Sequence, residues 1–356
     1  MKKRFVTIVR IVGALLGVLF FYSFLKSVDI AEGLALVVAH LWIFIPILLL
    51  YGLACLTDTI GWALLMSPAQ QGAGSFARIL QIHVVGESIV RSIPLGAIFA
   101  EGVKPYLLKT MVNVEYTSSI PSLILRKIGV GISQGLYVLV SGIVGFSLLK
   151  SLSRGLIGTE GIEWITIGIG FVITAAFGIS LAGVTSGRLM KVVHAVSTKV
   201  PLVVVQRWLE GKEKDFLVID RYLGTFGTHG KRTLILAVLI FIPGWIFECL
   251  ETVVILKALG APISVFDAYA FEPSISFLRS LVFILPAGLG VMDLGYTSVF
   301  RGMQIPGALA VAGAFVMFKR IREAVWILAG YILLVIGGGS KDKRPLLKAM
   351  IDGKIQ

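Results

Sequence analysis

Long runs of apolar side chains restrict the fold of this chain more than any other feature. A helix needs roughly 20 apolar residues to cross the hydrocarbon core of a bilayer, and several runs exceed that length. Only 15% of the residues are charged, against about 25% in soluble domains. We therefore predict an all-α integral membrane protein, a single membrane domain over residues 1–356. The six predicted transmembrane helices are residues 5–26, 41–66, 117–149, 162–183, 233–257 and 305–338.

The first predicted crossing follows Lys2, Lys3 and Arg4, a start that also fits a secretory signal peptide. Its apolar run extends from Phe5 to Leu25, which is long for a signal peptide. The run ends in the polar sequence KSVD, and no small-residue cleavage site follows it. We therefore interpret this segment as a first span that is retained in the mature protein.

Two further apolar stretches, 76–110 and 266–302, are interrupted by Pro, Gly and charged residues. The first contains RSIPLGAIFAEG and the second contains RSLVFILPAGLGVMDLG. Irregular backbone at membrane depth is tolerated only where protein or a water-filled cavity surrounds it. Each stretch therefore predicts a re-entrant helical hairpin near the centre of the protein. The predicted turn residues are Pro94, Gly96, Pro286, Gly288 and Gly290.

Basic residues gather at three places outside the crossings: the N-terminus, the segment 184–232 and the C-terminal tail. Six crossings and two re-entrant hairpins put all three on one side, which the positive-inside rule makes the cytoplasmic side. Both termini are then cytoplasmic, and 184–232 is a cytoplasmic amphipathic insertion. The net charge of +13 lies beside apolar runs and not in a nucleic-acid-binding module, so it favours contact with anionic lipid.

An internal repeat relates the two broken stretches and their flanking spans. Shifts of 192 or 193 residues match Pro94 with Pro286, Gly96 with Gly288, Glu101 with Asp293, Asp58 with Glu251, Arg126 with Lys319 and Lys127 with Arg320. The repeated units are 41–149 (repeat A) and 233–338 (repeat B), and the crossing between them inverts the second. Inverted repeats with discontinuous helices are typical of transporters. The alternative is two unrelated loops that share a Pro-Gly turn.

Charged residues within the apolar stretches are costly in a membrane and usually face a partner or a cavity. The candidate substrate-binding residues are Arg91, Glu101, Arg126, Lys127, Arg279, Asp293, Lys319 and Arg320, with supporting charges at Asp58, Glu87, Glu251, Glu272 and Glu323. Arginine grips phosphate with a planar fork, which suits an anionic lipid headgroup. The alternative is that these charges only neutralise one another. Glu87 and Arg91 are four residues apart, as are Lys319 and Glu323, and this spacing places each pair on one helix face.

Other kinds of chemistry find little support in the sequence. The four histidines show no metal-ligand spacing, and Cys55 and Cys249 are best interpreted as small buried side chains. We find no P-loop for ATP and no nucleophile with a positioned base, so we expect neither an enzyme nor a metal or other cofactor. The spacing of Gly131 and Gly135 predicts a helix-packing contact, within the chain or in a homodimer.

The segments VVGESIVRSIPLGAIFAEGVKPYLLKT, LILRKIG, LPAGLGVMDLGYTSVF and FVMFKRIREA resemble the lysylphosphatidylglycerol synthase transmembrane-region family, also called the flippase-like domain family. The resemblance covers roughly residues 5–338. It implies a domain of the prokaryotic cytoplasmic (inner) membrane that moves a lipid between leaflets. It also implies a partner enzyme of lipid or glycan biosynthesis. No soluble aminoacyl-transferase domain follows the last span, so we do not expect lysyl transfer. The turn Pro94-Leu95-Gly96 departs from the two glycines that the family often has.

The leading hypothesis is an ATP-independent flippase for an anionic phospholipid or a polyprenyl-linked lipid. The alternatives are a secondary transporter or channel for a small solute, or a non-transporting partner of a lipid-biosynthesis enzyme. A lateral opening wide enough for acyl chains would favour the lipid hypothesis. A closed, wholly protein-lined polar pocket would favour the solute hypothesis.

Overall fold

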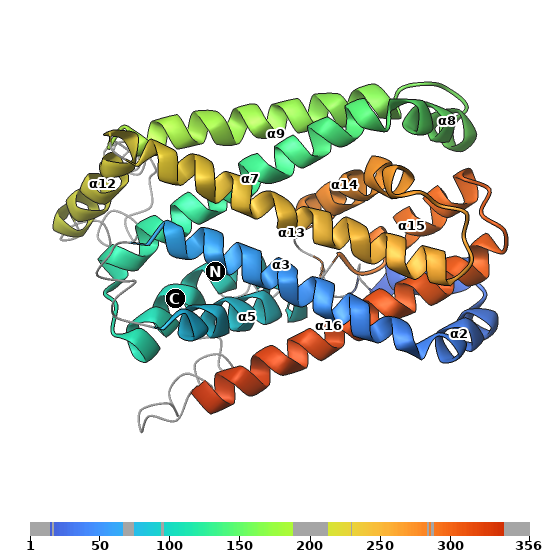
Figure 1. Cartoon of the computed structure of the whole chain (residues 1–356), viewed down its shortest axis with the longest axis horizontal. Coiled ribbons are helices and arrows are strands. Elements are labelled where there is room, and N and C mark those ends of the chain that lie inside the picture. The colour runs from blue at the N-terminus through green and yellow to red at the C-terminus, as the bar shows by residue number, and fades with distance from the viewer. Residues whose placement is uncertain are drawn as a thin grey trace.

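The structure is a computed structural model that describes residues 15, 18–66, 75–93, 96–187, 213–228, 230–282, 285 and 288–337. All regular elements within these residues are helical, and most run along the long axis of the molecule (Figure 1). They are the helix Val18–Ser27, α2 (Ile30–Ala39), η1 (Leu41–Ile43), α3 (Phe44–Leu64), α5 (Phe76–Ser92), α6 (Gly96–Leu107), η2 (Leu108–Val112), α7 (Tyr116–Val144), α8 (Phe146–Ile157), α9 (Ile162–Thr185), α12 (Glu213–Thr228), α13 (Lys231–Ala258), α14 (Val265–Leu281), α15 (Val291–Gly302) and α16 (Ala308–Gly337).

Within the described residues, four helical segments are long and apolar enough to cross a membrane: Leu41–Leu64, Tyr116–Val144, Ile162–Thr185 and Lys231–Ala258. The prediction of an α-helical membrane protein is therefore confirmed, whereas the count of six crossings stays a prediction. Helix α16 has 30 residues, but charged side chains interrupt its apolar sequence at Lys319, Arg320, Arg322 and Glu323. Most of the predicted first crossing lies outside the described residues.

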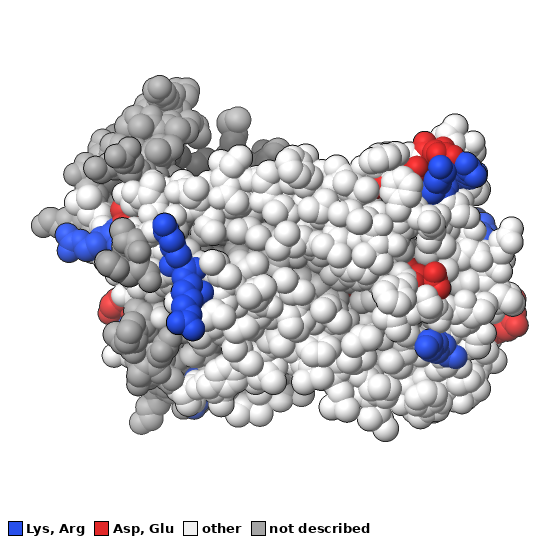
Figure 2. Space-filling view, turned by 45° about the horizontal axis from the view of Figure 1, so that its top comes forward, with Lys and Arg blue, Asp and Glu red and all other residues white. Residues whose placement is uncertain are grey.

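The lateral surface of the helical bundle is apolar. Large side chains such as Ile45 on α3, Phe171 and Ile179 on α9 and Val335 on α16 are more than half exposed. On the face shown in Figure 2, charged side chains gather toward the two ends of the long axis, and the middle is uncharged. Because this apolar area faces outward, contact with lipid accounts for it better than contact with water. We therefore expect the long axis to lie roughly along the membrane normal.

Each broken stretch forms a pair of short helices. Helices α5 and α14 have 17 residues each, and α6 and α15 have 12 residues each. At 1.5 Å per residue these lengths are about 25 Å and 18 Å, less than the roughly 30 Å of a bilayer core. Helix α5 lies toward the end of the bundle marked by α12, and α14 and α15 lie toward the opposite end (Figure 1). That the hairpins are re-entrant stays a prediction.

The packing partners of the two halves match when α3, α5, α6 and α7 are paired in order with α13, α14, α15 and α16. Helix α5 packs on α16, and correspondingly α14 packs on α7. The contact of α3 with α5 corresponds to that of α13 with α14, and α6 with α7 to α15 with α16. This is the packing expected of a repeated unit. The inversion of repeat B across the membrane stays a prediction.

The Gly131 and Gly135 pair packs α7 against α9 within the same chain. A Cβ atom added to Gly135 would lie 2.5 Å from Thr174 Oγ1 and 2.6 Å from Thr174 N. One added to Gly170 of α9 would lie 2.4 Å from Leu139 N. Glycine at these positions lets the two backbones approach closely. The motif is therefore used inside the chain, and the predicted homodimer would need another face.

Part of the predicted insertion 184–232 packs under the bundle. Helix α12 buries Ile219 and Leu223 against α7 and α9. The Tyr222 hydroxyl donates a hydrogen bond of 2.9 Å to the carbonyl of Leu65, just beyond the end of α3. Residues 188–212 of the insertion lie outside the described residues, and its cytoplasmic placement stays a prediction.

Candidate functional site

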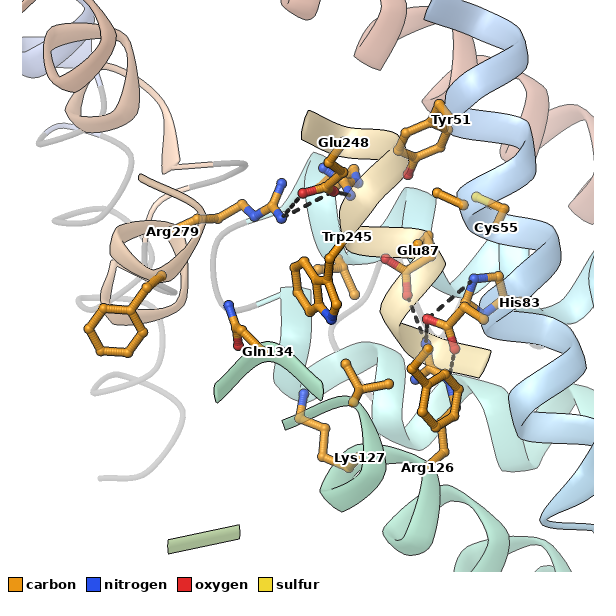
Figure 3. Close-up of a pocket in the computed structure, with 18 of the residues that line it drawn as sticks. Tyr51, Cys55, His83, Glu87, Arg126, Lys127, Gln134, Trp245, Glu248 and Arg279 are labelled. Carbon is orange, nitrogen blue, oxygen red and sulfur yellow. Dashed lines mark hydrogen bonds and ion pairs between the residues drawn. The ribbon is translucent and has the colours of Figure 1, made fainter. Parts of the chain in front are cut away.

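A cavity of about 520 Å³ lies between α3, α5, α7, α13 and α14, and residues of α6 and α9 contribute to its lining (Figure 3). This volume is within the range of roughly 300–1,000 Å³ typical of ligand sites. Its charged lining residues are Asp58, Glu87, Arg91, Lys104, Arg126, Lys127, Glu248 and Arg279, and the titratable side chains of Tyr51, Cys55 and His83 also line it. Its apolar lining includes Val90, Val130, Ile173, Phe177, Phe241, Trp245, Phe277 and Leu285. The cavity is therefore amphipathic.

Arg126 of α7 and Asp58 of α3 form a bidentate ion pair at the wall of the cavity. Arg126 Nε donates to Asp58 Oδ1 at 2.7 Å, and Arg126 Nη2 donates to Asp58 Oδ2 at 2.6 Å. Both residues were singled out in the sequence by the repeat. The buried His83 of α5 lies behind this pair, with its Nε2 3.9 Å from Asp58 Oδ2. A pair with two short bonds fixes the arginine in place.

Lys104 of α6 reaches the cavity across Gly86 of α5. A Cβ atom on Gly86 would lie 2.3 Å from Lys104 Cε, so glycine at this position makes room for the lysine stem. Lys104 Nζ donates to Glu87 Oε1 at 3.3 Å, and Arg126 Nη2 lies 3.6 Å from the same oxygen. Lys104 is 1% exposed to solvent, so its charge depends on the groups around it.

Arg91 and Arg279, one from each broken stretch, both line the cavity and meet around Glu248 of α13. Arg279 Nη2 donates to Glu248 Oε1 at 3.2 Å and to Oε2 at 3.0 Å. Arg91 Nη2 lies 4.0 Å from Glu248 Oε1, and Arg91 Nη1 donates to Glu323 at 3.2 Å. The same-helix pair of Arg91 with Glu87 is not the one that the structure forms, because Glu87 pairs with Lys104 and Arg126.

Eight further residues, seven of them charged, form a second group between α13, α14, α15 and α16, which we call the α13–α16 cluster. It contains Glu251, Glu272, Asp293, Tyr296, Lys319, Arg320, Arg322 and Glu323. None of these residues lines the described cavity. The candidate substrate residues Asp293, Lys319 and Arg320 are therefore placed beside the cavity and not in its wall.

Most ion pairs of the α13–α16 cluster connect different helices. Lys319 Nζ donates to Glu272 Oε1 at 2.9 Å, and Arg320 Nη2 donates to both oxygens of Asp293 at 2.6 and 2.8 Å. The sequence alternative that paired Lys319 with Glu323 is not what forms. Glu323 instead accepts from Arg320 at 2.8 Å and from Arg91. Arg91 therefore connects the cavity with the cluster.

The structure describes three of the five predicted turn residues, and one of these, Gly288, lines the cavity. Gly288 has φ of +64° and lines the cavity, and Gly290 has φ of +79° and precedes α15. The Gly290 amide donates to Asp293 Oδ2 at 2.9 Å, so this carboxylate caps α15 as well as pairing with Arg320. Gly96 is the first residue of α6. Pro94, Pro286 and the side chain of Glu101 lie outside the described residues.

Positive charge is concentrated on the cavity side of this interior network. Five basic and three acidic side chains line the cavity, which gives a formal charge of +2 when His83 is neutral. The α13–α16 cluster has three basic and four acidic side chains, and so a formal charge of −1. Buried charge is costly unless it is compensated. Among the described residues that line the cavity, the excess of basic over acidic side chains favours an anionic occupant.

Several lining residues were not chosen as site candidates from the sequence. Glu248 lies inside the predicted crossing 233–257, and Lys104 lies near the expected end of its broken stretch. Tyr51 packs its ring 5.1 Å from the Arg91 guanidinium and 4.6 Å from that of Arg322. Aromatic residues are frequent throughout this chain, so no sequence signal would have distinguished this ring. Within the described residues, no group of three His, Cys, Asp or Glu could hold a metal ion.

Comparison with protein families decides the membership of this chain. A sequence model described as the lysylphosphatidylglycerol synthase TM region matches residues 9–320. The chain belongs to this family. The match includes both broken stretches and every charged residue of the cavity, and it ends within α16. A search of curated proteins and a search of solved structures each gave no match. The predicted family is thus confirmed for the membrane region.

Proposed function

We propose that this protein is an ATP-independent flippase that moves an anionic phospholipid or a polyprenyl-linked lipid between the leaflets of the membrane. The observation that carries this proposal is the amphipathic cavity with surplus positive charge. A phosphate that crosses hydrocarbon without compensation meets a large desolvation barrier. Arg91, Arg126, Lys127 and Arg279 would replace part of its hydration shell and so lower that barrier.

The apolar part of the lining favours a lipid over a small solute. Ile173 and Phe177 of α9 border the cavity and are themselves partly exposed at the surface of the bundle. Only 11% of the most apolar 18-residue segment of α9 is buried inside the bundle. Most of this helix is therefore available for contact with lipid. An acyl or prenyl chain that stays in the bilayer could contact this side while its headgroup occupies the charged side. A solute transporter would have little use for a wall of this kind.

The two hairpins suggest how the headgroup would pass. If α5–α6 enters from the cytoplasmic side and α14–α15 from the opposite side, their inner ends meet near the middle of the membrane. The position of Arg91 and Arg279 around one carboxylate supports such a meeting point. Rocking of one repeat against the other would then expose the site alternately to the two leaflets. In this scheme both termini face the cytoplasm.

Lys127 gives the cleanest test of the function, because it lines the cavity but is exposed enough for its loss to have little effect on folding. We expect Lys127→Gln to weaken anionic headgroup binding by roughly 1.5–3 kcal/mol, or about 10- to 150-fold. The measurement is the flipping of a fluorescent phosphatidylglycerol in reconstituted vesicles, with the half-saturating mole fraction obtained from a concentration series.

The matched control for this variant is Lys150→Gln on α8, which removes a lysine far from the cavity. It should flip the anionic lipid as the unchanged protein does. If the unchanged protein flips no lipid but accumulates inorganic phosphate or another small anion, the solute alternative replaces the flippase. If Lys127→Gln and Lys150→Gln behave alike, the described cavity is not the headgroup site.

Membrane orientation gives an independent prediction. Cysteines placed at Gly74 and Lys109, on either side of the first hairpin, should both react with an impermeant reagent from the cytoplasmic side. Cysteines at Pro262 and Arg301 should both react from outside. The two native cysteines are buried and can be replaced beforehand. Reaction of Gly74 and Lys109 from opposite sides would show that the first hairpin crosses the membrane, and the inverted repeat would be wrong.

A further inference from the structure

The carboxylate of Glu248 lies where the two hairpin arginines converge. Glu248 belongs to α13, a long apolar helix, and not to either hairpin. Figure 3 shows Arg279 reaching from α14 toward this carboxylate at the wall of the cavity. Arg279 donates to it at 3.0 and 3.2 Å, and Arg91 Nη2 lies 4.0 Å away. A carboxylate of the protein itself therefore lies between the two hairpin arginines.

The bonds of Glu248 to its arginine are looser than those of the cavity carboxylate Asp58. Arg279 contacts both oxygens through a single nitrogen, at distances above the roughly 2.7–2.9 Å of strong charge-assisted bonds. Asp58, by contrast, accepts two bonds of 2.6 and 2.7 Å from two nitrogens of Arg126. Glu248 also has a neutral neighbour, since Ser276 Oγ donates to it at 3.4 Å. Of these two cavity carboxylates, Glu248 is therefore the easier to displace from its arginine.

We propose that Glu248 is an internal competitor of the substrate phosphate. When the cavity is empty, Glu248 neutralises Arg279 and part of the charge of Arg91. When a headgroup enters, its phosphate takes the guanidinium groups and Glu248 turns away from them. When the headgroup leaves, Glu248 returns and helps to release it. This inference rests on the proposed function. It makes Glu248 the residue that balances affinity for the lipid headgroup against release of the headgroup.

The physical reason is that two uncompensated guanidinium groups in a buried site would be costly when empty. They would also bind phosphate so strongly that release would limit the rate. A carboxylate that exchanges with the phosphate keeps the charge of the site nearly constant through the cycle. A purely structural ion pair would instead hold Arg279 and Arg91 in place throughout, and its loss would harm binding and transport together.

The test is Glu248→Gln, which keeps the size of the side chain and removes its charge. In vesicles with graded amounts of fluorescent phosphatidylglycerol, we expect the half-saturating fraction to fall about tenfold, because a competing charged contact is lost. We expect the maximal flipping rate to fall several-fold, because release is slower. Glu160→Gln in the α8–α9 loop neutralises an exposed glutamate far from the cavity and should change neither value.

A structural role predicts a different pattern, in which the half-saturating fraction of Glu248→Gln is unchanged or rises. Either result would overturn the proposal that Glu248 competes with the substrate phosphate. Should Glu248→Gln not fold, Glu248→Asp serves in its place, because it keeps the charge but withdraws the carboxylate by one methylene. It should lower the half-saturating fraction by less than tenfold, and no decrease would again overturn the inference. If the unchanged protein flips no anionic lipid, the proposed function fails, and the inference fails with it.

Discussion

Replacing Gly290 by alanine is expected to destabilise the protein by roughly 2–6 kcal/mol, from a strained backbone conformation and an overpacked contact. Gly290 has φ of +79°, a region that residues with a Cβ atom rarely adopt. The added Cβ would also lie 2.4 Å from the backbone carbonyl carbon of Phe20 and the backbone nitrogen of Phe21. Backbone atoms cannot move aside as a flexible side chain can. The measurement is the midpoint of thermal unfolding in detergent.

Two other glycines separate the causes of this effect. Gly307 has φ of +62° but no atom within 4 Å of the added Cβ, so alanine there should cost only the backbone strain. At Gly288 the new Cβ meets the side chain of Met292 at 2.9 Å, and this side chain can rearrange. We therefore expect the order Gly290 > Gly288 > Gly307. Equal losses of stability at Gly290 and Gly307 would mean that the helix Val18–Ser27 does not pack against Gly290, the residue before α15.

Removing one partner of the pair Glu251–Arg322 is expected to cost roughly 3–5 kcal/mol, typical of a buried ion pair that loses one side. Arg322 Nε donates to Glu251 Oε1 at 2.9 Å, and both side chains are less than 10% exposed. Glu251→Gln leaves a buried guanidinium without its main partner, and Arg322→Gln leaves a buried carboxylate. Thermal unfolding of the single variants measures both costs.

The double variant Glu251→Gln with Arg322→Met tests the origin of that cost. Because it removes both charges, it should recover most of the stability lost in the single variants. Neither residue lines the cavity, so the half-saturating fraction of anionic lipid should stay close to that of the unchanged protein. The exposed pair Arg154 and Glu160 is the control, and its removal should change stability little. A double variant as unstable as the sum of the singles would show that each residue has other essential contacts.

The sequence was sufficient for the class of the protein, for four of its spans and for the two broken stretches. Each of these features depends on local properties: the length of an apolar run, the presence of Pro and Gly, and the cost of a charge in hydrocarbon. The residues of the α5–α6 hairpin and of LILRKIG also carried the family resemblance, which the match over 9–320 confirms. The repeat was predicted because rare charged residues recur at spacings of 192 or 193 residues, and it stays a prediction.

Spacing along one helix was a poor guide to the partners of these charges. The i,i+4 rule proposed Glu87 for Arg91 and Glu323 for Lys319. In the folded protein Arg91 pairs with Glu323 of α16, and Lys319 pairs with Glu272 of α14. Within a bundle, a long side chain can meet a carboxylate of any neighbouring helix. The partner is then decided by which helix faces it, and a single sequence contains no direct measure of that.

The sequence by itself determined which residues are too costly to leave in lipid, because desolvation depends on the side chain and its apolar surroundings. Only the tertiary structure decided which of them face a cavity and which neutralise one another. It placed Arg91, Arg126, Lys127 and Arg279 in the cavity wall, and it placed Lys319 and Arg320 in the α13–α16 cluster. It also brought Lys104 and Glu248 into the site. The physical reason is that burial creates the need for a partner, while helix packing alone determines which partner lies within reach.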